Sequence, residues 1–119
     1  MLLDNISIDN PFGILIDEGR DYLAIGNLSE DIKFGTLTIV DGYRNYFAGE
    51  NHMVCNREKG MDILGQFGIF LNNQISHNTD FGMELTTSSA GNLIKDNKLV
   101  CNIPDNIADN GMDNNLIEI

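Results

Sequence analysis

The feature that most constrains this chain is a repeat of 22 to 24 residues that keeps one register along its length. "NHMVCN" at 51–56 returns as "NQISHN" at 73–78 and again as "NKLVCN" at 97–102. The first Asn of this frame belongs to a column with steps of 22, 24, 22 and 24 residues, which consists of Asn5, Asn27, Asn51, Asn73 and Asn97. A period of this length is typical of solenoids and other repeat architectures.

Each repeat contains three short apolar runs separated by Gly and Asn, such as "TLTIV" at 36–40 and "GIFL" at 68–71. No apolar 3.6-residue period continues for more than about two turns, so long helices are not expected. Three strands per repeat fit one coil of a parallel β-helix, where each strand pairs with its equivalent about 4.8 Å away. The sequence therefore predicts an all-β, right-handed parallel β-helix of about five coils, forming a single domain over 1–119.

Equivalent positions stack in such a coil, and this assigns roles to two columns. We expect the Asn column to form a structural ladder at a turn, because Asn tolerates turn conformations and carries both a donor and an acceptor. We expect an apolar column to fill the interior, and its members are Leu23, Phe47, Phe70, Ile94 and Ile117. A leucine-rich repeat has a similar period, but its L-x-x-L-x-L frame and helix-compatible stretch are absent.

The stretch "GMELTTSSAGNLIKDNKLVCN" at 82–102 resembles the repeat unit of right-handed parallel β-helix proteins of the pectate-lyase-like superfamily. That superfamily includes sugar hydrolases, lyases and epimerases, phage tailspikes, surface adhesins and periplasmic copper-binding maturation proteins. The resemblance is strongest at 82–102, extends over 35–78 and is looser at both ends. It implies a fold rather than an activity, because one scaffold carries many activities.

The charge of the chain argues against two classes of partner. The 18 acidic and 7 basic residues give a formal net charge of −11, which repels nucleic-acid phosphates and anionic membrane surfaces. No run approaches the roughly 18 apolar residues of a membrane span. The opening "MLLDNISIDN" lacks a basic n-region and an apolar h-region, so we expect no signal peptide within the chain. We expect the parent protein outside the cell, at a cell surface or on a virion.

The fifth position of the repeated corner offers metal-ligating side chains in every copy: Asp9, Asp31, Cys55, His77 and Cys101. Cys55, His77 and Cys101 would suit Cu(I) or Zn(II), and the copper-associated members of the superfamily make them weak candidates. A straight column spaces ligands about 4.8 Å apart, too far for three to share one ion at about 2.0–2.3 Å. We therefore predict no metal site, and two unbonded cysteines, because two coils exceed the disulfide limit of about 7 Å.

Four acidic residues are the candidate ligand-binding positions. Asp17 and Asp41 follow equivalent strands, whereas Asp62 and Glu84 occupy the same outward position in "GMDI" and "GMEL". Stacked carboxylates repel each other, so they could collect Ca²⁺ as a cofactor or face a hydroxyl-rich ligand. The alternative is a solvated acidic face that keeps the chain soluble.

The sequence favours a non-catalytic β-helix scaffold that binds polysaccharide or a surface protein partner. The alternatives are a fragment of a polysaccharide lyase, hydrolase or epimerase, and a copper-handling module. Enzyme activity is left open but is not favoured, because hydrolysis needs two carboxylates about 5 to 9.5 Å apart across a cleft and no long insertion forms one. No polar cap covers either end of the repeat, so we expect the chain to be part of a longer coil, to form a homo-oligomer, or to have a neighbouring domain that covers the ends.

Overall fold

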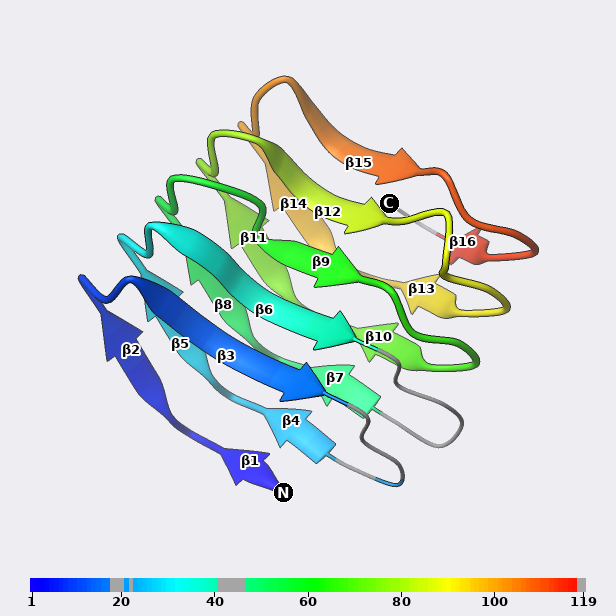
Figure 1. The fold of residues 1–119 in the computed structure, drawn as a ribbon, viewed down its shortest axis with the longest axis horizontal. Coiled ribbons are helices and arrows are strands. Elements are labelled where there is room, and N and C mark those ends of the chain that lie inside the picture. The colour runs from blue at the N-terminus through cyan, green and yellow to red at the C-terminus, as the bar shows by residue number, and fades with distance from the viewer. Residues whose placement is uncertain (18–20, 22, 41–46, 118–119) are drawn as a thin grey trace.

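The chain folds into a coil of short parallel strands (Figure 1). A computed structural model describes residues 1–17, 21, 23–40 and 47–117, and the side chains of these residues other than 34–40 and 47. The described residues form sixteen strands and no helix, so no described segment is a helix that could cross a membrane. The strands group into three sheets, which we call walls 1, 2 and 3.

Every third strand belongs to the same wall, and each repeat contributes one strand to each wall. Wall 1 contains β1 (Leu2–Leu3), β4 (Leu23–Ile25), β7 (Phe47–Gly49), β10 (Ile69–Leu71), β13 (Leu93–Lys95) and β16 (Asn115–Ile117). Wall 2 contains β2 (Ile6–Ile8), β5 (Leu28–Glu30), β8 (His52–Val54), β11 (Gln74–Ser76) and β14 (Lys98–Val100). Wall 3 contains β3 (Phe12–Asp17), β6 (Phe34–Val40), β9 (Met61–Ile63), β12 (Phe81–Leu85) and β15 (Asp105–Asp109).

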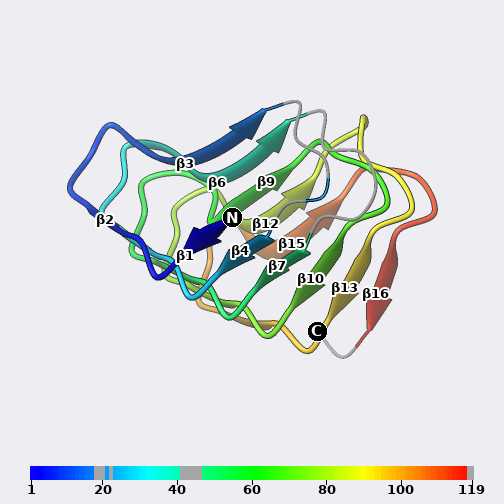
Figure 2. The same cartoon turned by 90° about the horizontal axis from the view of Figure 1, so that it is seen from below.

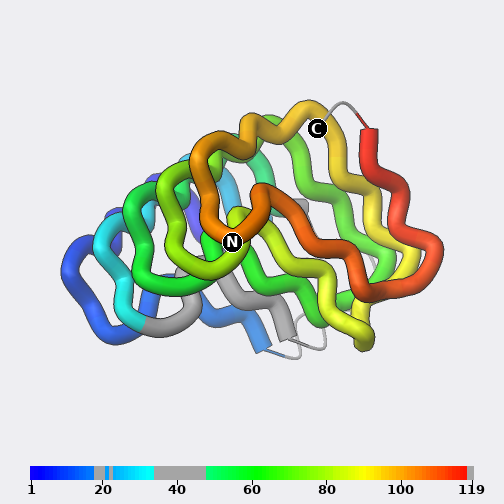
Figure 3. The backbone as a smooth tube through the Cα atoms, turned by 90° about the horizontal axis from the view of Figure 1, so that it is seen from above, coloured from blue at the N-terminus to red at the C-terminus, as the bar shows by residue number. Residues whose placement is uncertain are grey.

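The predicted fold class is confirmed. All strand pairs are parallel, and each joins equivalent strands of successive repeats. Walls 2 and 3 therefore stack five described strands through four coil-to-coil steps, and wall 1 adds a sixth strand. Figure 3 shows the successive coils stacked side by side along one axis.

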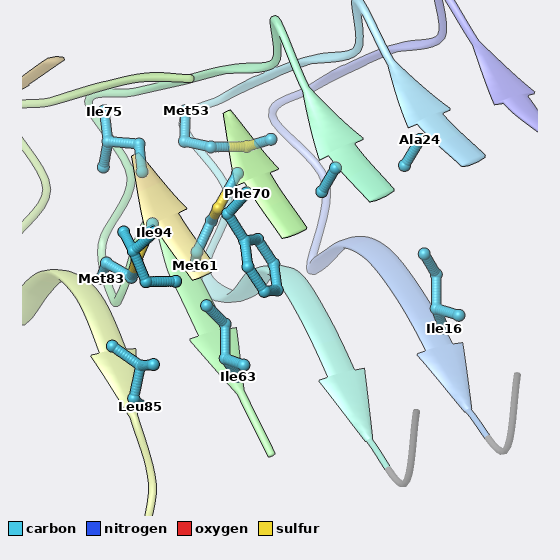
Figure 4. Packing of buried hydrophobic residues seen from close by; sticks show 11 residues of the cluster. Ile16, Ala24, Met53, Met61, Ile63, Phe70, Ile75, Met83, Leu85 and Ile94 are labelled. Carbon is cyan, nitrogen blue, oxygen red and sulfur yellow. The ribbon is translucent and has the colours of Figure 1, made fainter. Parts of the chain in front are cut away.

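The interior is filled by apolar side chains from all three walls (Figure 4). Phe70 of wall 1 is fully buried and lies in the same column as two alanines, so its ring has room above small neighbours. Wall 2 contributes Met53 and Ile75, and wall 3 contributes Met61, Ile63, Met83 and Leu85. On wall 1 the inner column consists of Ala24, Ala48, Phe70 and Ile94, with the partly buried Leu2 and Leu116 at its two ends.

The predicted inner column is therefore correct at Phe70 and Ile94 and wrong at Leu23 and Ile117, and the side chain of Phe47 lies outside the described ones. The strand pairing places Leu23 in line with Ile69, the outward position before Phe70, and the backbone of Phe47 pairs at that same position. It places Ile117 in line with the outward position after Ile94. A one-residue slip exchanges the two faces of a strand, and the apolar pattern did not prevent it because wall 1 is apolar on both faces.

The predicted Asn ladder is confirmed at the corner between walls 1 and 2. Along Asn5, Asn27, Asn51, Asn73 and Asn97, each backbone N–H and each Nδ2 donates to the Oδ1 of the next Asn at 2.9–3.1 Å. Nδ2 of Asn73 also donates to the Ala48 carbonyl at 3.0 Å, so this buried amide uses both its donors and its acceptor.

Two further Asn ladders close the other corners, and the sequence analysis missed them. Between walls 2 and 3, Asn56 donates to Asn78 and Asn78 to Asn102, with Nδ2–Oδ1 distances of 2.9 and 2.8 Å. Between walls 3 and 1, Asn92 donates to Oδ1 of Asn114 at 3.0 Å. The three corners of the coil are therefore tied along the axis by the same amide chemistry.

The residue before each described ladder Asn has a left-handed backbone conformation. At the first corner φ is 53° for Asp4, 52° for Glu50, 55° for Asn72 and 54° for Asp96, with Gly26 at 68°. This conformation costs an ordinary residue about 1–2 kcal/mol, and Asn, Asp and Gly adopt it most readily. The composition of the corners thus follows from the turn that the ladder needs.

Gly82 shows how closely the chain passes the second ladder. A Cβ at this position would lie 2.6 Å from Nδ2 of Asn102 and 2.4 Å from the carbonyl oxygen of Asn106. Gly60 has the same relation to Asn78 one coil earlier. The repeated "GM" in "GMDI" and "GMEL" is therefore a packing requirement of the ladder.

The corrected register predicts a sharp difference between two neighbouring residues. Phe70→Ala should lower the free energy of unfolding by roughly 3 to 5 kcal/mol, because it leaves a cavity at a fully buried position. Ile69→Ala, at an outward side chain that is 40% exposed, should cost less than about 1 kcal/mol. Guanidinium unfolding followed by circular dichroism measures both, and equal losses would contradict the register.

The ladder predicts a large effect at a polar residue. Asn73→Ala removes the Oδ1 that accepts from the buried N–H and Nδ2 of Asn51, so it should cost about 2 to 4 kcal/mol. Gln74→Ala, the adjacent outward position, serves as the control and should cost less than about 1 kcal/mol. The same unfolding measurement applies, and an Asn73→Ala variant as stable as the control would show that the ladder contributes little.

Candidate functional site

Wall 3 brings together two of the four predicted acidic residues. Asp62 of β9 pairs directly with Glu84 of β12, and both side chains lie on the outer face at about one-fifth exposure. Asp17 lies exposed at the end of β3, in register with Val40, and is not part of this pair. Asp41 lies outside the described residues.

Lys59 completes the group, and the sequence analysis missed it. Its Nζ lies 2.5 Å from Oε2 of Glu84 and 3.6 Å from Oδ2 of Asp62. Lys59 precedes Gly60 by one residue and follows the corner, so its side chain can run along the outer face of wall 3. The signal in the sequence was the i, i+3 spacing from Lys59 to Asp62, which indicates an ion pair only once the strand direction is known.

Burial and charge shift the pKa values of this group. Desolvation raises the pKa of Asp62, with a further rise from neighbouring Glu84 and a partly opposing effect of Lys59. Desolvation alone would lower the pKa of Lys59, but its hydrogen bond to Glu84 and the charges of Asp62, Glu84 and Asp80 leave it raised. Lys59 is therefore a stable cation at neutral pH.

The geometry of this group matches an ion pair better than a catalytic pair. A general base needs a pKa near the working pH, whereas the raised pKa of Lys59 keeps it protonated. The two carboxylates share one ammonium group, and Oδ1 of Asp62 is buried with no hydrogen-bond partner among the described residues. Among those residues no cluster of three or more His, Cys, Asp or Glu could hold a metal ion.

The column of metal-capable residues has a conformational explanation. Asp9, Asp31, Cys55, His77 and Cys101 all have φ between 52° and 58°, because they are the left-handed residues before the second corner position, which is Asn in every copy except Ile32. Asp and His are enriched in this conformation, which accounts for most of the column. The cysteines are unbonded, as predicted, and exposed. One member of the column, Asp31, forms an ion pair with Arg57, whose Nε lies 3.1 Å from Oδ1 of Asp31.

Wall 2 has a small hollow on its outer face. Gln74, Ser76 and His77 from one coil and Lys98 and Val100 from the next line a space of about 140 Å³. Ligand pockets usually have about 300 Å³ or more, so the hollow is too small to enclose a sugar or a nucleotide. Aligning "NQISHN" with "NKLVCN" would have predicted from the sequence that Gln74 lies beside Lys98 and Ser76 beside Val100.

Comparison of the chain with protein-family models, with curated proteins and with solved structures finds no match. The structure shows the parallel β-helix itself, and membership of the pectate-lyase-like superfamily stays a prediction.

The charged group on wall 3 predicts opposite effects of two similar substitutions. Glu84→Gln removes the shorter contact of Lys59 and should lower the free energy of unfolding by about 1 kcal/mol. Asp62→Asn removes a carboxylate that is partly desolvated and incompletely hydrogen-bonded, so at pH 7 it should leave stability unchanged or raise it.

The raised pKa of Asp62 fixes how this difference depends on pH. The folded state binds the Asp62 proton more tightly than the unfolded state does, so this contribution to stability is complete below the ordinary pKa of 3.8. It is lost as pH rises through the raised folded-state pKa. Any gain from Asp62→Asn should thus appear above that pH and vanish below it. Melting temperatures between about pH 3 and 8 test this, and a gain confined to acid would contradict it.

Proposed function

We propose that the chain is a rigid, non-catalytic β-helix module that binds a partner through an outer wall. The observation that carries this proposal is the separation of interior from exterior. The corners are closed by internal Asn ladders and the core is apolar. Such a frame presents side chains at fixed spacing without needing to move.

The partner classes favoured by the sequence are polysaccharide and a surface protein. The paired carboxylates and Lys59 on wall 3 could donate to and accept from sugar hydroxyls, with or without Ca²⁺. The protonated state of Lys59 and the small size of the wall 2 hollow make catalysis by the chain alone a weaker proposal. Copper handling is weaker still, because Cys55, His77 and Cys101 lie on successive coils about 4.8 Å apart.

A titration with defined saccharides tests the proposal. The ¹⁵N-labelled chain is mixed with a neutral and an acidic oligosaccharide, while the same samples are assayed for new reducing ends. We expect no product, and any shifts should be confined to one outer wall, with the ladder amide resonances unchanged. Turnover that is lost in Glu84→Gln would contradict a non-catalytic role. Absence of shifts with every saccharide would leave protein as the partner class.

A further inference from the structure

Wall 1 is apolar on its outer face as well as its inner face. Two outward columns of aliphatic side chains run along it, and Figure 2 shows its six strands in a row along one side of the coil. The described aliphatic members are Leu3, Leu23, Ile25, Ile69, Leu71, Leu93 and Ile117. Leu3 is 48% and Ile69 40% exposed. Sheets that are apolar on both faces are normally covered on both faces.

The outer faces of the other two walls also expose aliphatic side chains, but these are mixed with charged ones. On wall 2, Ile6, Ile8 and Val100 are 38–70% exposed, and the same face includes Glu30 and Lys98. On wall 3, Leu15 is 64% exposed, and the same wall includes Asp62 and Glu84. On wall 1, Lys95 is the one charged residue that the described strands contribute. Wall 1 is therefore the wall whose described outward residues are most aliphatic and least charged.

Carboxylates border wall 1 on both sides. Asp4, Glu50 and Asp96 occupy the left-handed corner that follows its strands, and all three are exposed. Asp21 and Asp113 occupy the corner that precedes the strands and are also exposed. The charge of Lys95 is already balanced, since its Nζ lies 3.9 Å from Oδ2 of Asp96. The aliphatic columns thus lie between two rims that both contain carboxylates, and the second rim also contains Phe67 and Gly91.

The size and charge of wall 1 select among possible occupants. Six strands at about 4.8 Å spacing and three residues each cover about 24 by 10 Å. Two copies of the chain would bring like-charged rims together at a net charge of −11 each, which opposes face-to-face pairing. An α-helix of about 16 residues is about 24 Å long and 10–12 Å wide, which matches the wall.

We propose that wall 1 binds an amphipathic α-helix of a protein partner. The apolar stripe of the helix packs on the two aliphatic columns, and lysines or arginines on its flanks face the carboxylates of the two rims. Helix on sheet is a stable layer arrangement, and here the apolar contact supplies affinity while the rims supply orientation. This inference rests on the proposed function and goes beyond it by naming the wall and the chemistry of the partner.

A synthetic peptide of about 16 residues, with Leu at i, i+3, i+4 and i+7 and Lys elsewhere, is the probe. It is titrated into the ¹⁵N-labelled full chain. We expect shifts confined to wall 1 and its two corners, a gain of peptide helicity on binding, and an affinity that decreases as salt is raised. A peptide of the same composition in scrambled order, and one with Glu in place of Lys, should bind at least tenfold more weakly.

Matched variants separate wall 1 from general attraction to an acidic protein. Ile69→Asp should weaken peptide binding at least tenfold, whereas Leu15→Asp should not, although Leu15 is an outward aliphatic side chain that is 64% exposed on wall 3. Glu50→Gln with Asp96→Asn should weaken binding and reduce its salt dependence. If Ile69→Asp lowers the melting temperature, the shift map of the unsubstituted chain decides alone.

Three results would overturn the inference. Shifts that lie on wall 2 or wall 3, or equal binding of the Glu peptide, would show that wall 1 is not the site. A dimer in sedimentation that Ile69→Asp abolishes would assign the wall to a second copy. If the peptide does not bind the unsubstituted chain and no saccharide is turned over, the helix partner is ruled out and the scaffold function stands. If a saccharide is turned over, the non-catalytic scaffold function itself is contradicted.

Discussion

The amide–amide hydrogen bond between stacked asparagines is the interaction on which the rest of this structure depends. Each ladder Oδ1 accepts both the backbone N–H and the Nδ2 of the preceding coil, so one side chain satisfies a turn that would otherwise bury unpaired polar groups. The Asn51, Asn73 and Asn78 side chains are 0–1% exposed, where an unpaired amide would be costly. Because each bond joins equivalent corners of adjacent coils, an Asn recurs once per coil, at steps of 22 or 24 residues.

The sequence could therefore predict the fold class and the first ladder, since both depend on the spacing of one residue type. It could not fix the face of every strand in wall 1. Phe47 and Phe70 look equivalent by composition, yet they pair one position apart, and a wall that is apolar on both faces gives no penalty for the slip. The second ladder could also have been predicted, because the repeated frames "NHMVCN", "NQISHN" and "NKLVCN" end in its members Asn56, Asn78 and Asn102.

The candidate site was predictable only in part, for a related reason. Asp62 and Glu84 share a position in similar strands, so their pairing followed from the repeat. Lys59 reaches them from outside the strand, and its direction depends on the turn after the second corner rather than on the period. The column of metal-capable residues looks like a site because the left-handed conformation and metal coordination both favour Asp and His.

The exposed corner carboxylates connect folding to surface chemistry. Asp4, Asp96 and Asp113 are favoured where they are by backbone conformation, yet they also place negative charge beside the aliphatic columns of wall 1. An uncovered apolar sheet face invites aggregation, and like-charged rims oppose the edge-on and face-on contacts through which it would start. Those rims repel another copy and attract a basic flank. The same corner carboxylates therefore have two effects: they adopt the left-handed turn that closes each coil, and their negative charge selects for partners with basic flanks at wall 1.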